Sequence, residues 1–93
     1  MNERVANIAS RVGLHARPAA IFAEAVAGLE NDVTIARQGE PEEFAVDASS
    51  ILSLMGLGIS HGEVVVLRSE GAVESLDHLV DILETDLDIE TPS

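Results

Sequence analysis

Residues 13–20 read Gly13-Leu14-His15-Ala16-Arg17-Pro18-Ala19-Ala20, and they place a titratable ring and a guanidinium beside a proline. Proline is favoured in the first turn of a helix, where its missing N–H is no loss, and it disfavours helical geometry in the residue before it. From Pro18 onward the chain carries strong helix formers and an apolar stripe at positions 18, 22, 25, 26 and 29. We therefore predict a helix over about 16–27, with His15 just ahead of its N-terminus.

The place of His15 before a helix has chemical consequences. Unpaired backbone N–H groups and the positive end of the helix dipole attract an anion, and Arg17 adds a charged fork that suits phosphate oxygens. A nearby cation favours the neutral imidazole, whose free nitrogen is a nucleophile. Two interpretations stay open on these residues alone. Either His15 carries a phosphoryl group in an anion cradle formed by the Ala16, Arg17 and Pro18 region, or it is a surface histidine before an ordinary helix.

The rest of the chain predicts a mixed pattern of strands and helices. The predicted strands are 3–10, 33–37, 44–47 and 63–68, of which the last is almost continuously apolar and should be central. A short helix, capped by Ser49 or Ser50, should end near Leu57, and a long amphipathic helix should cover 72–87. Its core-facing side chains should be Val73, Leu76, Leu79, Val80, Leu83 and Leu87. This order predicts an α+β fold with an antiparallel sheet and helices on one face.

The length and composition of the chain limit the number of domains, the kinds of metal site and the location that we expect. The chain has 93 residues, 46% of them hydrophobic, which suits one domain that we expect over 1–88, followed by a polar tail at 89–93. It has no cysteine, so we expect no thiolate metal site, and we expect no cofactor. No apolar run approaches a membrane span, so we expect a cytoplasmic protein without membrane insertion.

The charge of the chain is strongly acidic. Its formal net charge is −12, with five arginines and no lysine, which disfavours binding to nucleic acid. Solubility, a saline cytoplasm and a GC-rich genome each explain this composition. His61 lies in a glycine-rich turn and has no ligand at metal spacing. His78 lies on the polar side of the last helix among Asp77 and Asp81, where a solvated surface position is favoured over a weak cation site. We therefore expect no metal site.

A second motif, residues 48–59, reads Ala-Ser-Ser-Ile-Leu-Ser-Leu-Met-Gly-Leu-Gly-Ile. Together with residues 13–19 it resembles HPr, the histidine-containing phosphocarrier family of the sugar phosphotransferase system, and the resemblance extends over roughly residues 4–87. The resemblance implies an open-faced β-sandwich, in which a four-stranded antiparallel sheet carries three helices on one face. The element order predicted from the residues is β-α-β-β-α-β-α, and the strand order that the resemblance implies is 1-4-2-3.

The function that the resemblance implies centres on His15. This residue would accept a phosphoryl group from phosphorylated enzyme I and pass it to sugar-specific enzyme IIA domains, with Arg17 stabilising the group. The chain would then be a phosphoryl carrier rather than a turnover enzyme alone. The family also implies an HPr kinase/phosphorylase and a transcriptional regulator as partners. Two alternatives remain: a specialised paralogue in a nitrogen-linked or dihydroxyacetone-kinase phosphorelay, and a regulatory binding module without phosphotransfer.

The second motif holds a candidate regulatory site and a candidate docking patch. Ser50 matches the family's regulatory serine, but it is equally a good N-cap, and Ser49 stands where the family commonly has a basic residue. The expected docking residues are Ile51, Leu52, Leu54 and Met55. Other positions where relatives often present basic side chains hold Glu24, Ala27 and Ser53, so we expect partners adapted to this chain.

Overall fold

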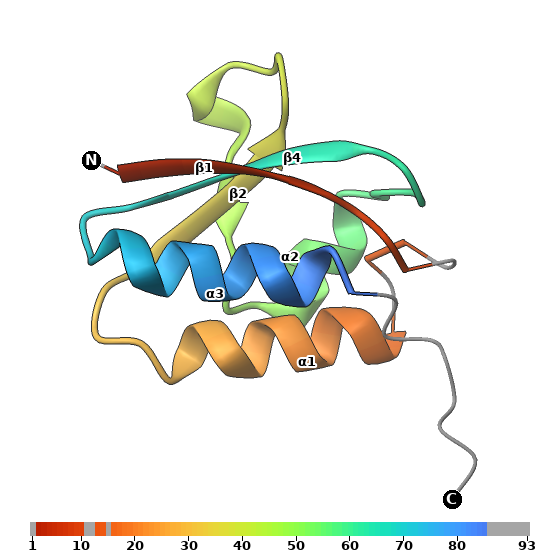
Figure 1. The fold of residues 1–93 in the computed structure, drawn as a ribbon. Coiled ribbons are helices and arrows are strands. Elements are labelled where there is room, and N and C mark those ends of the chain that lie inside the picture. The colour runs from red at the N-terminus through yellow and green to blue at the C-terminus, as the bar shows by residue number, and fades with distance from the viewer. Residues whose placement is uncertain (1, 11–12, 15, 86–93) are drawn as a thin grey trace, which may run out of the picture.

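The computed structural model describes residues 2–10, 13–14 and 16–85. Its elements in order are β1 (Asn2–Asn7), α1 (Ala16–Ala27), β2 (Val33–Arg37), a 3-10 turn η1 (Glu42–Phe44), β3 (Val46–Asp47), α2 (Ile51–Gly56), β4 (Val64–Ser69) and α3 (Val73–Leu83). The strands form one sheet, the three α-helices lie on one side of it, and η1 rises on the other side (Figure 1). The predicted α+β open-faced sandwich is confirmed.

The sheet has the strand order β1-β4-β2-β3, and every neighbouring pair is antiparallel. β4 lies between β1 and β2, so that Val66 is opposite both Val5 and Ala36. Its central place agrees with its nearly continuous apolar sequence, because such a strand has no exposed edge. This order also brings the chain after β1 beside the loop that leads into β4.

The core is aliphatic except for one phenylalanine, as the composition requires. On α1, Phe22 is fully buried, Val26 nearly so and Ala25 partly buried. Leu29, just after the helix, is also partly buried and packs against the core. On α3, the buried side chains are Leu76, Leu79 and Leu83, with Val73 and Val80 partly buried. Leu87 and the expected tail lie outside the described residues.

Two strands, β1 and β3, are shorter than predicted. Residues 42–44 form a 3-10 turn, because Phe44 N–H donates to Pro41 O at 3.0 Å and Ala45 N–H donates to Glu42 O at 2.9 Å. These backbone groups are then used locally and cannot pair with β2. β1 ends at Asn7. Ile8 N–H still bonds across to Glu63 O, directly before β4, but Ala9 N–H leaves the sheet and donates to Leu83 O at the end of α3.

Candidate functional site

α1 begins at Ala16, as predicted, so its N-terminus directly follows His15 in the chain. His15 itself lies outside the described residues. Arg17 is exposed in the first turn, which holds no acidic residue, and the next residue, Pro18, is buried. The positive end of the helix dipole and the guanidinium therefore act together at this end of α1, with no carboxylate in that turn to oppose them.

The two described residues just before His15 lie against residues 58–63, which we call the support loop. Leu14 N–H donates to Ile59 O at 3.1 Å, and the Leu14 side chain is only 2% exposed. Gly13 has a φ of +70°, and a Cβ at this position would overlap the Ile59 carbonyl and lie 2.9 Å from the Cα of Ser60. A glycine is thus required both by the backbone conformation and by the close approach of the support loop.

Two carboxyl groups have lowered pKa values, Asp47 in β3 and Glu63 in the support loop. The hydroxyl and the backbone N–H of Ser49 both donate to Asp47, at 2.7 and 2.9 Å, and hold the pKa of Asp47 below its ordinary value of 3.8. The backbone N–H of Ser60 and the guanidinium of Arg37 likewise lower the pKa of Glu63 below 4.5. In both cases hydrogen bonds favour the charged carboxylate.

The lowered pKa of Glu63 predicts a pH dependence of stability. A depressed folded-state pKa adds stability that is fully present above the ordinary value and is lost as the pH falls through the folded-state pKa. We therefore expect the free energy of unfolding to fall as the pH is lowered below 4.5, and Glu63→Gln to reduce that slope. Chemical denaturation at a series of pH values measures it, and equal slopes in the two proteins would contradict it.

Ser50 is the N-cap of α2, which confirms one of the two serines named above. Its Oγ accepts from the backbone N–H of Ser53 at 3.2 Å. Ser49 instead bonds to Asp47 and takes no part in the cap. Capping satisfies an N–H group that the helix leaves unpaired.

The cap predicts different effects for the two neighbouring serines. We expect Ser50→Ala to lower the free energy of unfolding by about 1 kcal/mol, the usual worth of an N-cap. Ser49→Ala, which removes an exposed hydroxyl outside the cap, should have a smaller effect. Urea titrations of both variants measure the difference. A larger loss in the Ser49 variant would show that the Asp47 contact, not the cap, holds this end of α2.

Only two of the four predicted docking residues, Ile51 and Leu52, are exposed. Leu52 is 83% exposed and Ile51 42%, but Leu54 is fully buried and Met55 is partly buried against the core. The prediction that Leu54 takes part in docking is therefore wrong, because the face of α2 that carries Leu54 packs into the core. Leu52 lies two residues earlier, and a rotation of about 200° around the helix axis places it on the outer face. We call Ile51 and Leu52 the α2 patch. The surrounding residues 48–62 contain no acidic residue, arginine or lysine.

The other two histidines have the surface positions expected of them. His61 is exposed in the support loop, and its Nδ1 lies 3.1 Å from the carbonyl oxygen of Ser10, to which it donates. His78 is exposed on α3. Within the described residues, no three potential ligands lie close enough to share a metal ion. No described helix is both long and apolar enough to cross a membrane.

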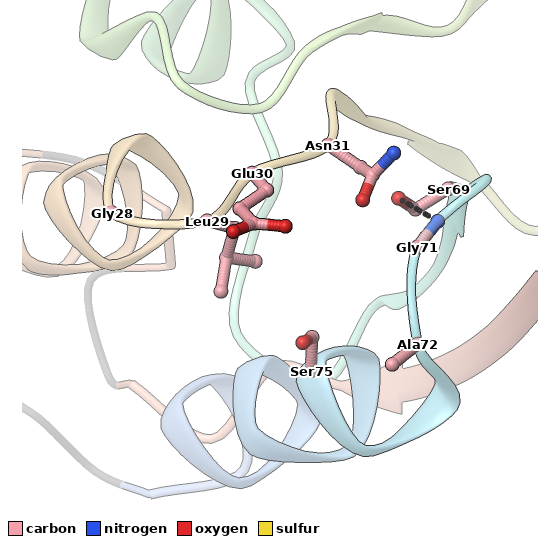
Figure 2. Close-up of a pocket in the computed structure, with 8 residues that line it drawn as sticks. All are labelled: Gly28, Leu29, Glu30, Asn31, Ser69, Gly71, Ala72 and Ser75. Atoms are coloured by element: carbon pink, nitrogen blue, oxygen red, sulfur yellow. Dashed lines mark hydrogen bonds between the residues drawn. The ribbon is translucent and has the colours of Figure 1, made fainter.

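A hollow of about 310 Å³ lies at the opposite end of α1, where this helix ends near the start of α3 (Figure 2). Its lining residues are Gly28, Leu29, Glu30, Asn31, Ser69, Gly71, Ala72 and Ser75. Only Glu30 among them is titratable, and the buried Ser69 hydroxyl accepts from Gly71 N–H at 3.0 Å. Since α1 has 12 residues and is therefore about 18 Å long, this hollow contributes nothing to the chemistry at Arg17.

Comparison with known proteins shows the family to which the chain belongs. The family described as the PTS HPr component phosphorylation site matches residues 2–85. The chain belongs to the HPr family. The phosphocarrier protein HPr of Haloferax volcanii is 42% identical over 85 residues, which are 89% of this chain and 93% of that protein. HPr of Streptomyces coelicolor is 42% identical over 91 residues, or 95% and 94%.

Solved HPr structures share the fold described above. The HPr-C-His structure from Thermoanaerobacter tengcongensis has a TM-score of 0.78 and 36% identity, covering 90% of this chain and 92% of that one. HPr from Bacillus anthracis has a TM-score of 0.77 and 28% identity, covering 88% and 95%. The strand order that the HPr resemblance implied is therefore correct.

Proposed function

We propose that this chain carries a phosphoryl group on His15, accepting it from phosphorylated enzyme I and delivering it to enzyme IIA domains in the cytoplasm. The observation that carries the proposal is the start of α1 at Ala16, directly after His15, with Arg17 exposed in an acid-free first turn. Membership of the HPr family, whose phosphocarriers serve the phosphotransferase system, supports it independently.

The chemistry asks little of the protein beyond positioning and charge. Nδ1 of the neutral imidazole attacks the phosphorus in line, a P–N bond forms to His15, and the bond to the donor breaks. Delivery to enzyme IIA reverses these roles, so no water or second substrate is consumed. The negative charge spreads over the three outer oxygens, which the first-turn N–H groups and Arg17 stabilise. Because Arg17 is exposed, the anion cradle at the start of α1 is shallow. A shallow cradle suits a carrier that must release the phosphoryl group to its next partner.

We propose that partners dock on the α2 patch. Leu52 presents nearly its whole side chain to solvent, and the neutral segment 48–62 contrasts with the net charge of −12 on the chain. An exposed apolar group on a neutral surface suits an apolar pocket in a partner. A phosphate on Ser50, next to Ile51, would add up to two negative charges at this surface and weaken docking, so we propose Ser50 as a regulatory position.

The deciding experiment is incubation with phosphoenolpyruvate and the cognate enzyme I, followed by intact mass spectrometry. We expect a phosphoryl adduct that is labile in acid and stable in base, as a phosphohistidine is. Absence of an adduct would contradict the carrier function and favour a purely regulatory binding module. Transfer of the adduct to enzyme IIA of a sugar transporter, rather than to a nitrogen-linked or dihydroxyacetone-kinase acceptor, separates the general carrier from a specialised paralogue.

Arg17→Ala is expected to slow phosphorylation by about tenfold to a hundredfold, because it removes a cation that neutralises the transferring group. The unfolding midpoint should hardly change, since the side chain is exposed. Arg17→Lys keeps the charge without the planar fork and should lose less. Rapid-quench phosphorylation assays measure the rates. An alanine variant as fast as the parent would assign the stabilisation to backbone groups alone.

A further inference from the structure

We propose that Arg37, at the end of β2, is a positioning residue for the segment that leads to His15, and that it acts through the support loop. The inference rests on the proposed function of His15. Arg37 is 20 positions along the chain from Arg17 and belongs to neither sequence motif. Two sets of contacts connect it to the residues before α1.

The first set joins the support loop to the segment that precedes the site. Leu14 N–H donates to Ile59 O at 3.1 Å, and Gly13 lies so close to Ile59 and Ser60 that no side chain fits between them. Farther back, Gly62 N–H donates to Ile8 O at 2.9 Å. The positions of Ile8, Gly13 and Leu14 are therefore set by where the support loop lies.

The second set holds the support loop from its other side. The Nη2 of Arg37 donates to Gly58 O at 3.0 Å, and its Nε donates to Glu63 Oε1 at 2.9 Å. Glu63 Oε2 accepts the backbone N–H of Ser60. One guanidinium thus ties both ends of the loop together, and a fork with two donors in fixed geometry is needed to do so.

The composition of the loop explains why such a tie matters. Gly58 and Gly62 both lie within it, at φ values of +64° and +85°, and glycine has the largest conformational freedom to lose. Arg37 and Glu63 keep about a third of their side-chain surface exposed, so their ion pair by itself adds little stability. The main effect of Arg37 is then on the geometry of the loop rather than on global stability.

The test compares Arg37→Gln with Arg4→Gln in the full chain. Arg4 is a matched control, because its Nε also lies 2.9 Å from a carboxylate, that of Asp77 on α3, away from the support loop. We expect Arg37→Gln to lower the turnover of phosphorylation by enzyme I about tenfold, since small misplacements of reacting groups have large effects on rate. The KM for enzyme I should not change, because the α2 patch is intact. Arg37→Lys should restore only part of the rate.

A second readout does not depend on phosphorylation. Hydrogen exchange of the Leu14 amide should accelerate in Arg37→Gln, while the amides of β4 keep their protection and the unfolding midpoint matches that of Arg4→Gln. A uniform acceleration with a lower midpoint would overturn the proposal, because Arg37 would then be merely structural. If the parent is phosphorylated and Arg37→Gln reacts as fast as Arg4→Gln, the proposal also fails. If the parent is not phosphorylated at all, the carrier function fails, and the Leu14 exchange alone decides whether Arg37 orders the segment.

Discussion

His15→Ala is expected to abolish the acid-labile phosphoryl adduct entirely, to the background seen without enzyme I. The reason is chemical: alanine has no nucleophilic nitrogen, and Arg17 can stabilise a phosphoryl group but cannot accept one. Intact mass after incubation with phosphoenolpyruvate and enzyme I measures the loss, and circular dichroism verifies that the variant is folded.

The chain supplies its own controls for this prediction. Neither His61 nor His78 lies in the first turn of α1, so His61→Ala and His78→Ala should still form the adduct. His78, on α3, is the cleaner control, because His61 belongs to the support loop that contacts Gly13 and Leu14. An adduct of undiminished size in His15→Ala would exclude His15 as the acceptor. The two control variants would then identify which of the remaining histidines carries the phosphate.

Gly13→Ala is expected to lower both stability and the rate of phosphorylation. The φ of +70° costs an L-residue about 1–2 kcal/mol. The overlap of the new Cβ with the Ile59 carbonyl adds about 1–3 kcal/mol of crowding. Relief of this crowding must move either the support loop or Leu14. The hydrogen bond between Leu14 and Ile59 should therefore weaken, and phosphoryl transfer through the neighbouring His15 should slow.

Gly39→Ala is the matched control for Gly13→Ala. Gly39 also has a positive φ, of +90°, but a Cβ at this position meets nothing within 4 Å. It therefore reports the backbone strain alone. The difference between the two losses in unfolding free energy, measured by urea titration, isolates the close approach at Gly13. Equal losses of unfolding free energy in the two variants would show that the support loop moves away from a Cβ at position 13 without cost. Phosphorylation of Gly13→Ala at the parent rate would show the same.

The predictions that failed share a cause. Leu54 has the same helical spacing as its apolar neighbours, and nothing in the local sequence says which of them faces the core. Its burial depends on how α2 packs against α1, which is distant in the chain. The 3-10 turn at Glu42–Phe44 was likewise missed, because a short apolar run after a loop is compatible with a strand until its hydrogen-bond partners are known.

Sequence alone determined the features that depend on neighbours a few residues apart. The start of α1 at Ala16 follows from Pro18 in its first turn. The cap of α2 follows from Ser50, whose hydroxyl accepts a hydrogen bond from the N–H of Ser53, three residues later. These interactions form within one turn, so composition and spacing suffice to predict them. Membership of the HPr family came from two such local motifs at the right separation.

Tertiary structure alone decided what holds the site. The hydrogen-bonded ion pair between Arg37 and Glu63 joins residues 26 positions apart. The hydrogen bond between Leu14 and Ile59 joins the connection that follows β1 to the connection that precedes β4. Neither pair has a local signature, because a polar contact over such a separation exists only once β1, β4 and β2 have paired. The residues that we propose for phosphoryl transfer therefore lie in one short segment, whereas the contacts of Gly13 and Leu14 that place this segment come from a loop that the fold brings beside it.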